Sequence, residues 1–207
     1  TSKEAPSAKI KVDVNDIGKV DLKVELTNKD EVSLHNYRYE VKNTYNQIVD
    51  SNNINSDGKI KLYELDPNQT YEIEIYSDYD LNDGKGTQTN KLIGKTSFIT
   101  MNLTSLGYLN LNTKEVEVKT NEATLSFEIN KEATDTRLLS MLDNIEISLL
   151  EEDEVIYQQR LNSKEKETLL NNEILEKTFN NLKASTTYKL EIKSILKQGT
   201  KEYKYDV

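Results

Sequence analysis

Cysteine and tryptophan are absent from this chain, histidine occurs once, and no long run of apolar side chains interrupts its polar sequence. Without cysteine, neither a disulfide nor a thiolate-bound metal can form. A membrane-spanning helix needs about 20 consecutive apolar residues, so we expect no direct insertion into a membrane. The single histidine, His35, stands beside no marked nucleophile or orienting acid, and we expect it at the surface. We therefore predict no cofactor, no catalytic residue and no enzymatic activity.

Positive charge is also in short supply. The formal net charge is −9, and acidic side chains outnumber basic ones in each half of the chain. A protein that binds nucleic acid usually presents a basic surface to the phosphate backbone, so we expect no nucleic-acid partner. An acidic, hydrophilic surface mainly confers solubility.

The two ends carry no targeting signal. The chain opens on Thr1 without an initiator methionine or a signal peptide, and its last expected strand runs to Val207. We expect a segment of a longer parent protein, whose flanking domains are then its nearest partners.

One pattern occurs twice. Residues 65–75 read LDPNQTYEIEI and residues 182–192 read LKASTTYKLEI. In both segments a leucine precedes a tyrosine by six residues, and apolar residues alternate after the tyrosine. A repeat at this spacing predicts two similar domains. We place a linker at 1–7, the first domain at 8–101 and the second at 102–207.

Alternation with a period of two dominates both halves and predicts about seven short strands in each. Val116 and Val118 match the apolar positions of the first strand in the first half. The second half carries extra residues near 134–143 and 163–172, where we expect short helices, the first capped by Asp135 or Thr134. A binding protrusion is one interpretation of these insertions, and a cover over an open end of the sandwich is the favoured one.

The repeated motif resembles a known family. Leu65-x-Pro67-x-x-x-Tyr71 is similar to the tyrosine corner of fibronectin type III modules, which are immunoglobulin-like sandwiches. The resemblance implies that the tyrosine hydroxyl bonds back to upstream backbone while its ring fills the edge of the core. Leu182 and Tyr188 repeat the motif. The implied fold is all-β, with two tandem fibronectin type III-like sandwiches, the second carrying the helical insertions.

The chain departs from that family at several points. Leu22 and Leu125 stand where fibronectin modules usually place a tryptophan, Ala184 replaces Pro67 in the second motif, and there is no Arg-Gly-Asp. The strands, rich in Lys, Asn and Tyr, resemble modules of long bacterial surface proteins and of phage tail proteins.

Oxygen-bearing side chains two residues apart follow the first motif. Asp78, Asp80, Asn82 and Asp83 are candidate calcium ligands. An EF-hand loop needs glycine at its sixth position and glutamate at its twelfth, where this chain has Asp83 and Thr89. Asn-Asp-Gly-Lys-Gly is also typical of a hairpin turn, and we favour that interpretation.

Tyrosine is abundant, with 12 residues, and exposed tyrosines bind sugars or proteins. Tyr76 and Tyr79 form a candidate recognition surface, with half-buried sheet tyrosines as the commoner alternative. Glu72 and Glu74 alternate with Ile73 and Ile75, so we expect them on a solvated face rather than in a glycosidase-like pair.

These observations favour a non-catalytic structural or recognition module, a spacer or adhesion segment of a larger extracellular assembly. We expect a location at a bacterial cell surface or in a virion tail, with a host-surface protein or a glycan as the external partner. The alternative is a carbohydrate-binding accessory module of a secreted enzyme.

Overall fold

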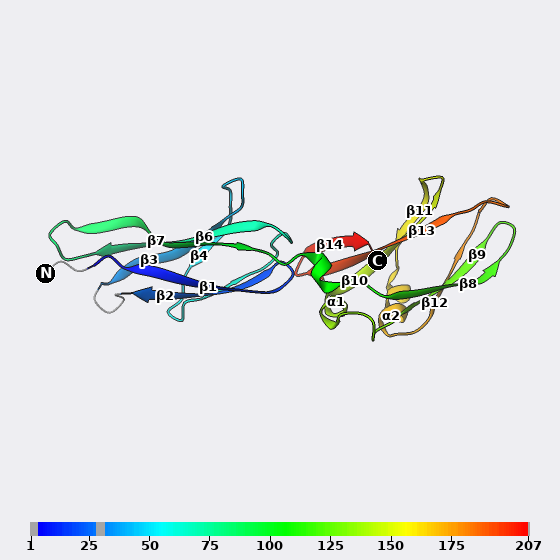
Figure 1. The fold of residues 1–207 in the computed structure, drawn as a ribbon, viewed down its shortest axis with the longest axis horizontal. Coiled ribbons are helices and arrows are strands. Elements are labelled where there is room, and N and C mark those ends of the chain that lie inside the picture. The colour runs from blue at the N-terminus through cyan, green and yellow to red at the C-terminus, as the bar shows by residue number, and fades with distance from the viewer. Residues whose placement is uncertain (1–3, 28–31, 207) are drawn as a thin grey trace. The chain divides into compact units, whose positions relative to one another are not determined.

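The computed structural model describes residues 4–27 and 32–206. The chain divides into two compact units, Thr1–Asn102 and Leu103–Val207. Each unit consists of one three-stranded and one four-stranded antiparallel sheet (Figure 1). None of the helices in the described part of the chain has the length and apolar character that a membrane crossing requires.

Seven strands build the first unit. They pair in the orders β1-β2-β5 and β4-β3-β6-β7. Their bounds are Ser7–Asp16 for β1, Lys19–Thr27 for β2, Leu34–Lys42 for β3, Ile48–Asn53 for β4, Lys59–Leu62 for β5, Thr70–Asp80 for β6 and Thr87–Ile99 for β7.

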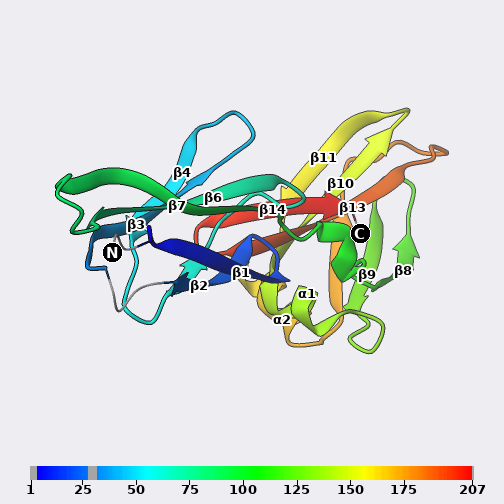
Figure 2. The same ribbon diagram turned by 60° about the vertical axis from the view of Figure 1, so that its left-hand side comes forward.

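The second unit repeats this arrangement. Its sheets have the orders β12-β9-β8 and β11-β10-β13-β14, and a turned view shows β8 and β9 standing apart from β10 and β11 (Figure 2). The strands are Leu111–Val118 (β8), Ala123–Ile129 (β9), Leu142–Glu151 (β10), Glu154–Arg160 (β11), Leu175–Phe179 (β12), Lys189–Gln198 (β13) and Lys201–Asp206 (β14). The helices are η1 (Leu103–Leu106), α1 (Thr136–Met141) and α2 (Ser163–Leu170).

Numbered within each unit, strands one, two and five form one sheet, and strands four, three, six and seven form the other. This order fits a fibronectin type III-like sandwich. The expected all-β fold of two tandem sandwiches is therefore confirmed, as are the short helices of the second.

Alternating side chains build the core of the first unit. Along β6, Tyr71, Ile73 and Ile75 point inward and are buried, and they meet Leu22 and Val24 from β2 in one cluster. Because successive side chains of a strand point to opposite faces, the period of two in the sequence places these residues correctly.

The two helical insertions cover part of the second core. Asp135 caps α1 by accepting a hydrogen bond from the Arg137 N–H, and Leu138 and Met141 are buried. Asn162 caps α2 in a reciprocal pair with Glu165, the capping-box arrangement that satisfies two free backbone donors. Helix α2 packs against β9 and β12 and buries Leu169.

Gly58 provides a test of the turn before β5. Its φ is +68°, and an added Cβ would lie 2.3 Å from the carbonyl oxygen of Val24 on β2. The Gly58 carbonyl oxygen also accepts a hydrogen bond from the Val24 N–H. We expect Gly58→Ala to destabilise the first unit by about 3 kcal/mol or more in denaturant melts, because backbone strain and a backbone clash combine.

The matched control is Gly84→Ala. Gly84 also has a positive φ, of +83°, but nothing lies within 4 Å of its added Cβ, so this change should cost only the strain of about 1–2 kcal/mol. Equal losses for the two variants would contradict the close approach at Val24.

Candidate functional site

Both repeated tyrosines bond back to the backbone five residues upstream. The Tyr71 hydroxyl accepts a hydrogen bond from the Asp66 N–H at 2.9 Å, and the Tyr188 hydroxyl accepts one from the Lys183 N–H at 2.7 Å. Each bond ties the turn before the sixth strand to that strand. Of the two leucines of the motif, Leu65 is buried in the core of its unit, whereas Leu182 is half-buried.

The surroundings of the two tyrosines differ. Tyr71 is 4% exposed and stacks on Phe98 of β7, with ring centroids 5.9 Å apart. Tyr188 is half-buried. In the first unit β7 pairs with β6 from Thr70 onward and covers the Tyr71 ring. In the second unit the described pairing of β14 with β13 begins at Lys193, opposite Asp206.

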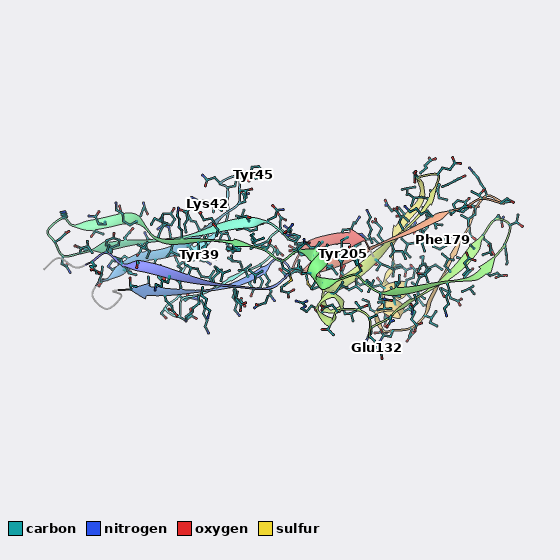
Figure 3. The ribbon with its side chains drawn as sticks, in the orientation of Figure 1. Tyr39, Lys42, Tyr45, Glu132, Phe179 and Tyr205 are labelled. Carbon is teal, nitrogen blue, oxygen red and sulfur yellow. The ribbon has the colours of Figure 1, made fainter. Side chains whose placement is uncertain are left out.

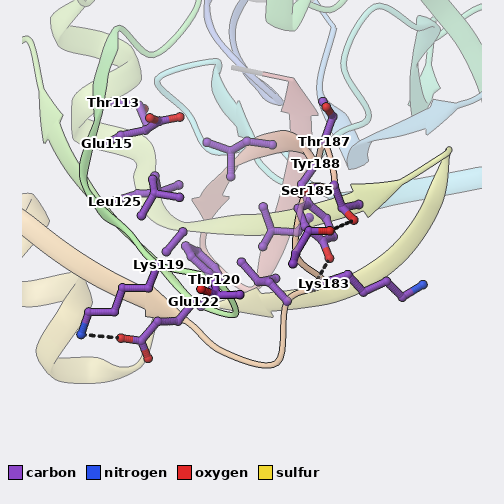
Figure 4. A pocket seen from close by; sticks show the side chains of 18 of the residues that line it. Thr113, Glu115, Lys119, Thr120, Glu122, Leu125, Lys183, Ser185, Thr187 and Tyr188 are labelled. Atoms are coloured by element: carbon purple, nitrogen blue, oxygen red, sulfur yellow. Dashed lines mark hydrogen bonds and ion pairs between the residues drawn. The ribbon is translucent and has the colours of Figure 1, made fainter.

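A pocket of about 840 Å³ opens beside Tyr188 in the second unit. The β8–β9 hairpin forms one wall, and the turn before β13 forms the other, where Thr187 and Tyr188 face Thr113 and Glu115 (Figure 4). Leu190 also lines it. The pocket therefore lies between the first strand and the sixth strand of the sandwich.

Strand β8 leaves this space open because its inner face is polar. Thr113 pairs with Phe127 and Glu115 with Leu125, so these side chains share a face with the core residues opposite them. In β1 the matching face carries Ile10, Val12 and Val14, which pack against the core. Polar side chains in these positions cannot close the sandwich in the same way.

Val116 and Val118 do not complete that face. They are 51% and 63% exposed. Their match to the apolar positions of the first strand therefore does not make them buried. The pairing register shifts between Glu115 and Glu117, which places Val118 opposite Ala123 and so on the face of Leu125 and Phe127. Val118 is exposed there because it lines the open pocket.

Three of the four candidate calcium ligands, Asp78, Asp80 and Asp83, accept hydrogen bonds from backbone amides. Asp80 accepts from the Asn82 N–H at 2.8 Å and Asp83 from the Lys85 N–H at 3.0 Å, which are local turn-capping bonds. Asp78 lies on β6 and accepts from the Asn90 N–H at 2.8 Å. Among residues 4–27 and 32–206, no three His, Asp or Glu side chains are grouped so that they could hold a metal ion.

Tyr79 does not belong to a recognition surface. It is 8% exposed and lies in the core of the first unit, so its assignment to the surface was wrong. The physical reason is parity, because Tyr79 is an even number of residues from Tyr71 on an alternating strand. Tyr76 does lie on the outer face, but it is half-buried there.

A compact charged cluster covers that outer face. The Tyr76 hydroxyl donates to Glu74, Lys42 forms an ion pair with Glu74 at 2.8 Å, and the Arg38 guanidinium lies 5.1 Å from the centre of the Tyr76 ring. Glu74 is only 8% exposed, so its expected position on a solvated face was wrong. The Lys42 ammonium and then the Tyr76 hydroxyl lower the pKa of Glu74. Burial, followed by the bond to Glu74, raises the pKa of Tyr76 to about 12.

One further repeated pair lies beyond the quoted motif. Ser77 and Ser194 are both fully buried, and they are separated by the same interval as Tyr71 and Tyr188. The Ser77 hydroxyl donates to the carbonyl oxygen of His35 at 3.0 Å, while the His35 side chain is exposed. Extending the repeat beyond its apolar positions could have found this pair.

The two tyrosine hydroxyls should stabilise their units unequally. We expect Tyr71→Phe to destabilise the first unit by about 1 kcal/mol, because it leaves the Asp66 N–H without its acceptor. Tyr188→Phe should cost less, since Lys183 is exposed and water can reach its amide. Denaturant melts that resolve the two units measure both changes, and a larger loss at Tyr188 would contradict the difference in burial.

The ion pair of Glu74 should make the first unit sensitive to acid. A carboxyl group with a lowered folded-state pKa stabilises the fold above its unfolded pKa, and this contribution disappears as the pH falls through the folded pKa. We expect the wild-type free energy of unfolding to fall more steeply than that of Glu74→Gln between about pH 5 and pH 2.

The control is Glu72→Gln, which removes a carboxylate from the same strand and face but leaves the ion pair of Lys42 with Glu74 in place, and it should stay closer to wild type than Glu74→Gln does. Urea melts across this range measure the effect. Parallel curves for wild type and Glu74→Gln would contradict the stabilising pair.

Comparison with known proteins gives similarity of fold alone. No family model and no curated protein matches the chain. A two-domain fibronectin type III segment of chicken tenascin aligns over 98% of both chains, with 12% identity and a TM-score of 0.36. The central fibronectin III array of a RIM-binding protein aligns over the whole chain and 69% of its own length, with 11% identity and a TM-score of 0.28. These scores are low, so the assignment rests on strand order: the chain folds as two tandem fibronectin type III-like sandwiches.

Proposed function

We propose that this chain is a non-catalytic structural and interaction module, a spacer or adhesion segment of a larger extracellular bacterial surface or phage tail assembly. The observation that carries the proposal is the duplicated sandwich, in which each unit has its own core and its own tyrosine bond. Repeated autonomous modules suit a chain that must span a distance or present loops on a rigid support.

The path of the chain through the first unit supports a load-bearing role. The chain enters at the start of β1 and leaves at the end of β7, at opposite ends of the sandwich (Figure 1). Tension along the chain therefore acts parallel to the strands, and it must shear the ladders that join β1 to β2 and β7 to β6. All the hydrogen bonds of such a ladder resist together, because they lie perpendicular to the strands.

The ionisable groups of both units also serve the fold. The ion pair of Lys42 with Glu74 joins β3 to β6, and that of Lys204 with Glu146 joins β14 to β10. Each pair ties strands together on the four-stranded sheet of its unit. Because these charged side chains form ion pairs that hold strands together, they support a structural role more than a catalytic one.

Exposed loops supply surface for adhesion. Tyr45 projects from the hairpin between β3 and β4 (Figure 3) and is 83% exposed. Flanking domains of the same parent chain and a host-surface protein or glycan are the proposed partners. The carbohydrate-binding alternative loses part of its support, because Tyr79 lies in the core and Tyr76 lies beneath Arg38.

Single-molecule stretching tests the proposal. We expect two separate unfolding events, each of which lengthens the chain by about 330–370 Å before the folded length is subtracted, since each unit holds about 100 residues. Phe127→Ala, which empties a fully buried core site of the second unit, should weaken one event and leave the other unchanged. Extension without resisted events would contradict a load-bearing spacer.

A further inference from the structure

The tripeptide Asp-Gly-Lys occurs twice in the first unit. Residues 57–59 lie in the turn before β5, and residues 83–85 lie in the loop between β6 and β7. In both copies the aspartate accepts a hydrogen bond from the lysine N–H two residues later, at 2.9 Å for Asp57 and 3.0 Å for Asp83. The glycine has a positive φ in both, +68° and +83°. The two copies are therefore matched in sequence and in local turn, and they differ in what surrounds them.

An aspartate that precedes glycine can react with its own main chain. The glycine nitrogen attacks the aspartate Cγ, a C–N bond forms, and the carboxyl hydroxyl leaves with the amide proton as water. Water then opens the succinimide ring. Hydrolysis at the former side-chain carbonyl restores aspartate, and hydrolysis at the main-chain carbonyl leaves isoaspartate, in which the chain continues through Cγ. The water released is taken up again, so the mass is unchanged. Glycine favours the reaction because it has no Cβ to shield its nitrogen.

The surrounding structure holds the first copy in place. The Gly58 N–H donates to the Asn55 carbonyl oxygen at 2.9 Å, and the Gly58 carbonyl oxygen accepts from the Val24 N–H at 2.8 Å. The carbonyl oxygen of Asp57 accepts from the Lys23 ammonium at 2.6 Å. Gly58 is also buried. Ring closure turns this peptide unit about the backbone of Asp57, so it must disrupt these bonds.

The second copy is not held in this way. Gly84 is exposed, and nothing lies within 4 Å of a Cβ added there. In the described part of the chain, no group accepts a hydrogen bond from the Gly84 N–H. The bond from the Lys85 N–H keeps the Asp83 carboxyl group close to the main chain that carries the attacking nitrogen. The peptide unit can therefore turn without breaking a contact of the sandwich.

We propose that Asp83 is a site of spontaneous isoaspartate formation, and that the fold protects Asp57, in the same tripeptide, from this reaction. Isoaspartate adds a carbon atom to the main chain of the loop and moves the carboxylate closer to it. The ladder of β6 with β7 ends at the pair of Asp80 and Thr87, so residues 81–86 lie outside it. The modification reshapes the loop and leaves the sandwich intact. It does not depend on the spacer role proposed above.

Peptide mapping of the full chain after prolonged storage in neutral buffer tests the proposal. A peptide with isoaspartate has the same mass as its parent but a different retention time, and an isoaspartate-specific methyltransferase labels it. We expect Asp57 to convert more slowly than Asp83 by about tenfold or more, because backbone hydrogen bonds must open first. The internal control is the same chain unfolded in urea, in which the two sites should convert at similar rates.

Two variants identify the chemistry. Asp83→Glu should abolish the product at this site, since a longer side chain must close a larger ring. Asp83→Asn should form the same succinimide faster, with ammonia as the leaving group, and its product should show the mass change of deamidation. The proposal is overturned by equal rates at Asp57 and Asp83 in the folded chain, by a faster rate at Asp57, or by no isoaspartate at Asp83 over a period in which the unfolded chain forms it.

Discussion

The backbone ladder between the sixth and seventh strands is the interaction on which each sandwich most depends. It lies next to the tyrosine bond, and it brings in the side chains that cover the ring. In the first unit this ladder runs the length of β6, so Tyr71 is buried against Phe98 and the core is closed. In the second unit the described ladder joins Lys193–Gln198 to Lys201–Asp206, and Tyr188 is half-buried beside a pocket.

The first unit relates this ladder to the proposed role. A module that carries load needs a complete ladder along the strands through which tension passes, and the pairing of β7 with β6 provides one. In the second unit the polar Thr113 and Glu115 of β8 line the pocket beside Tyr188.

Much of the fold follows from the sequence because the period of two and the repeated motif are local signals. They place Tyr71, Ile73 and Ile75 correctly, and the capping residue Asp135 predicts α1. The same alternation of inward and outward side chains, applied to the end of β6, also predicts that Tyr79 is buried. The site was harder to predict. The burial of Glu74 depends on Lys42 from a neighbouring strand, and the exposure of Val118 depends on the open pocket that it lines. These are long-range features that no single segment encodes.

Amide hydrogen exchange of the chain alone tests the central claim most directly. In an antiparallel sheet successive amides of a strand point alternately to its two neighbours. The account predicts that the amides of residues 72–75, which point alternately to β3 and β7, all exchange slowly. Fast exchange at every second amide of this stretch would contradict it, since it would mean that the ladder between β6 and β7 is open.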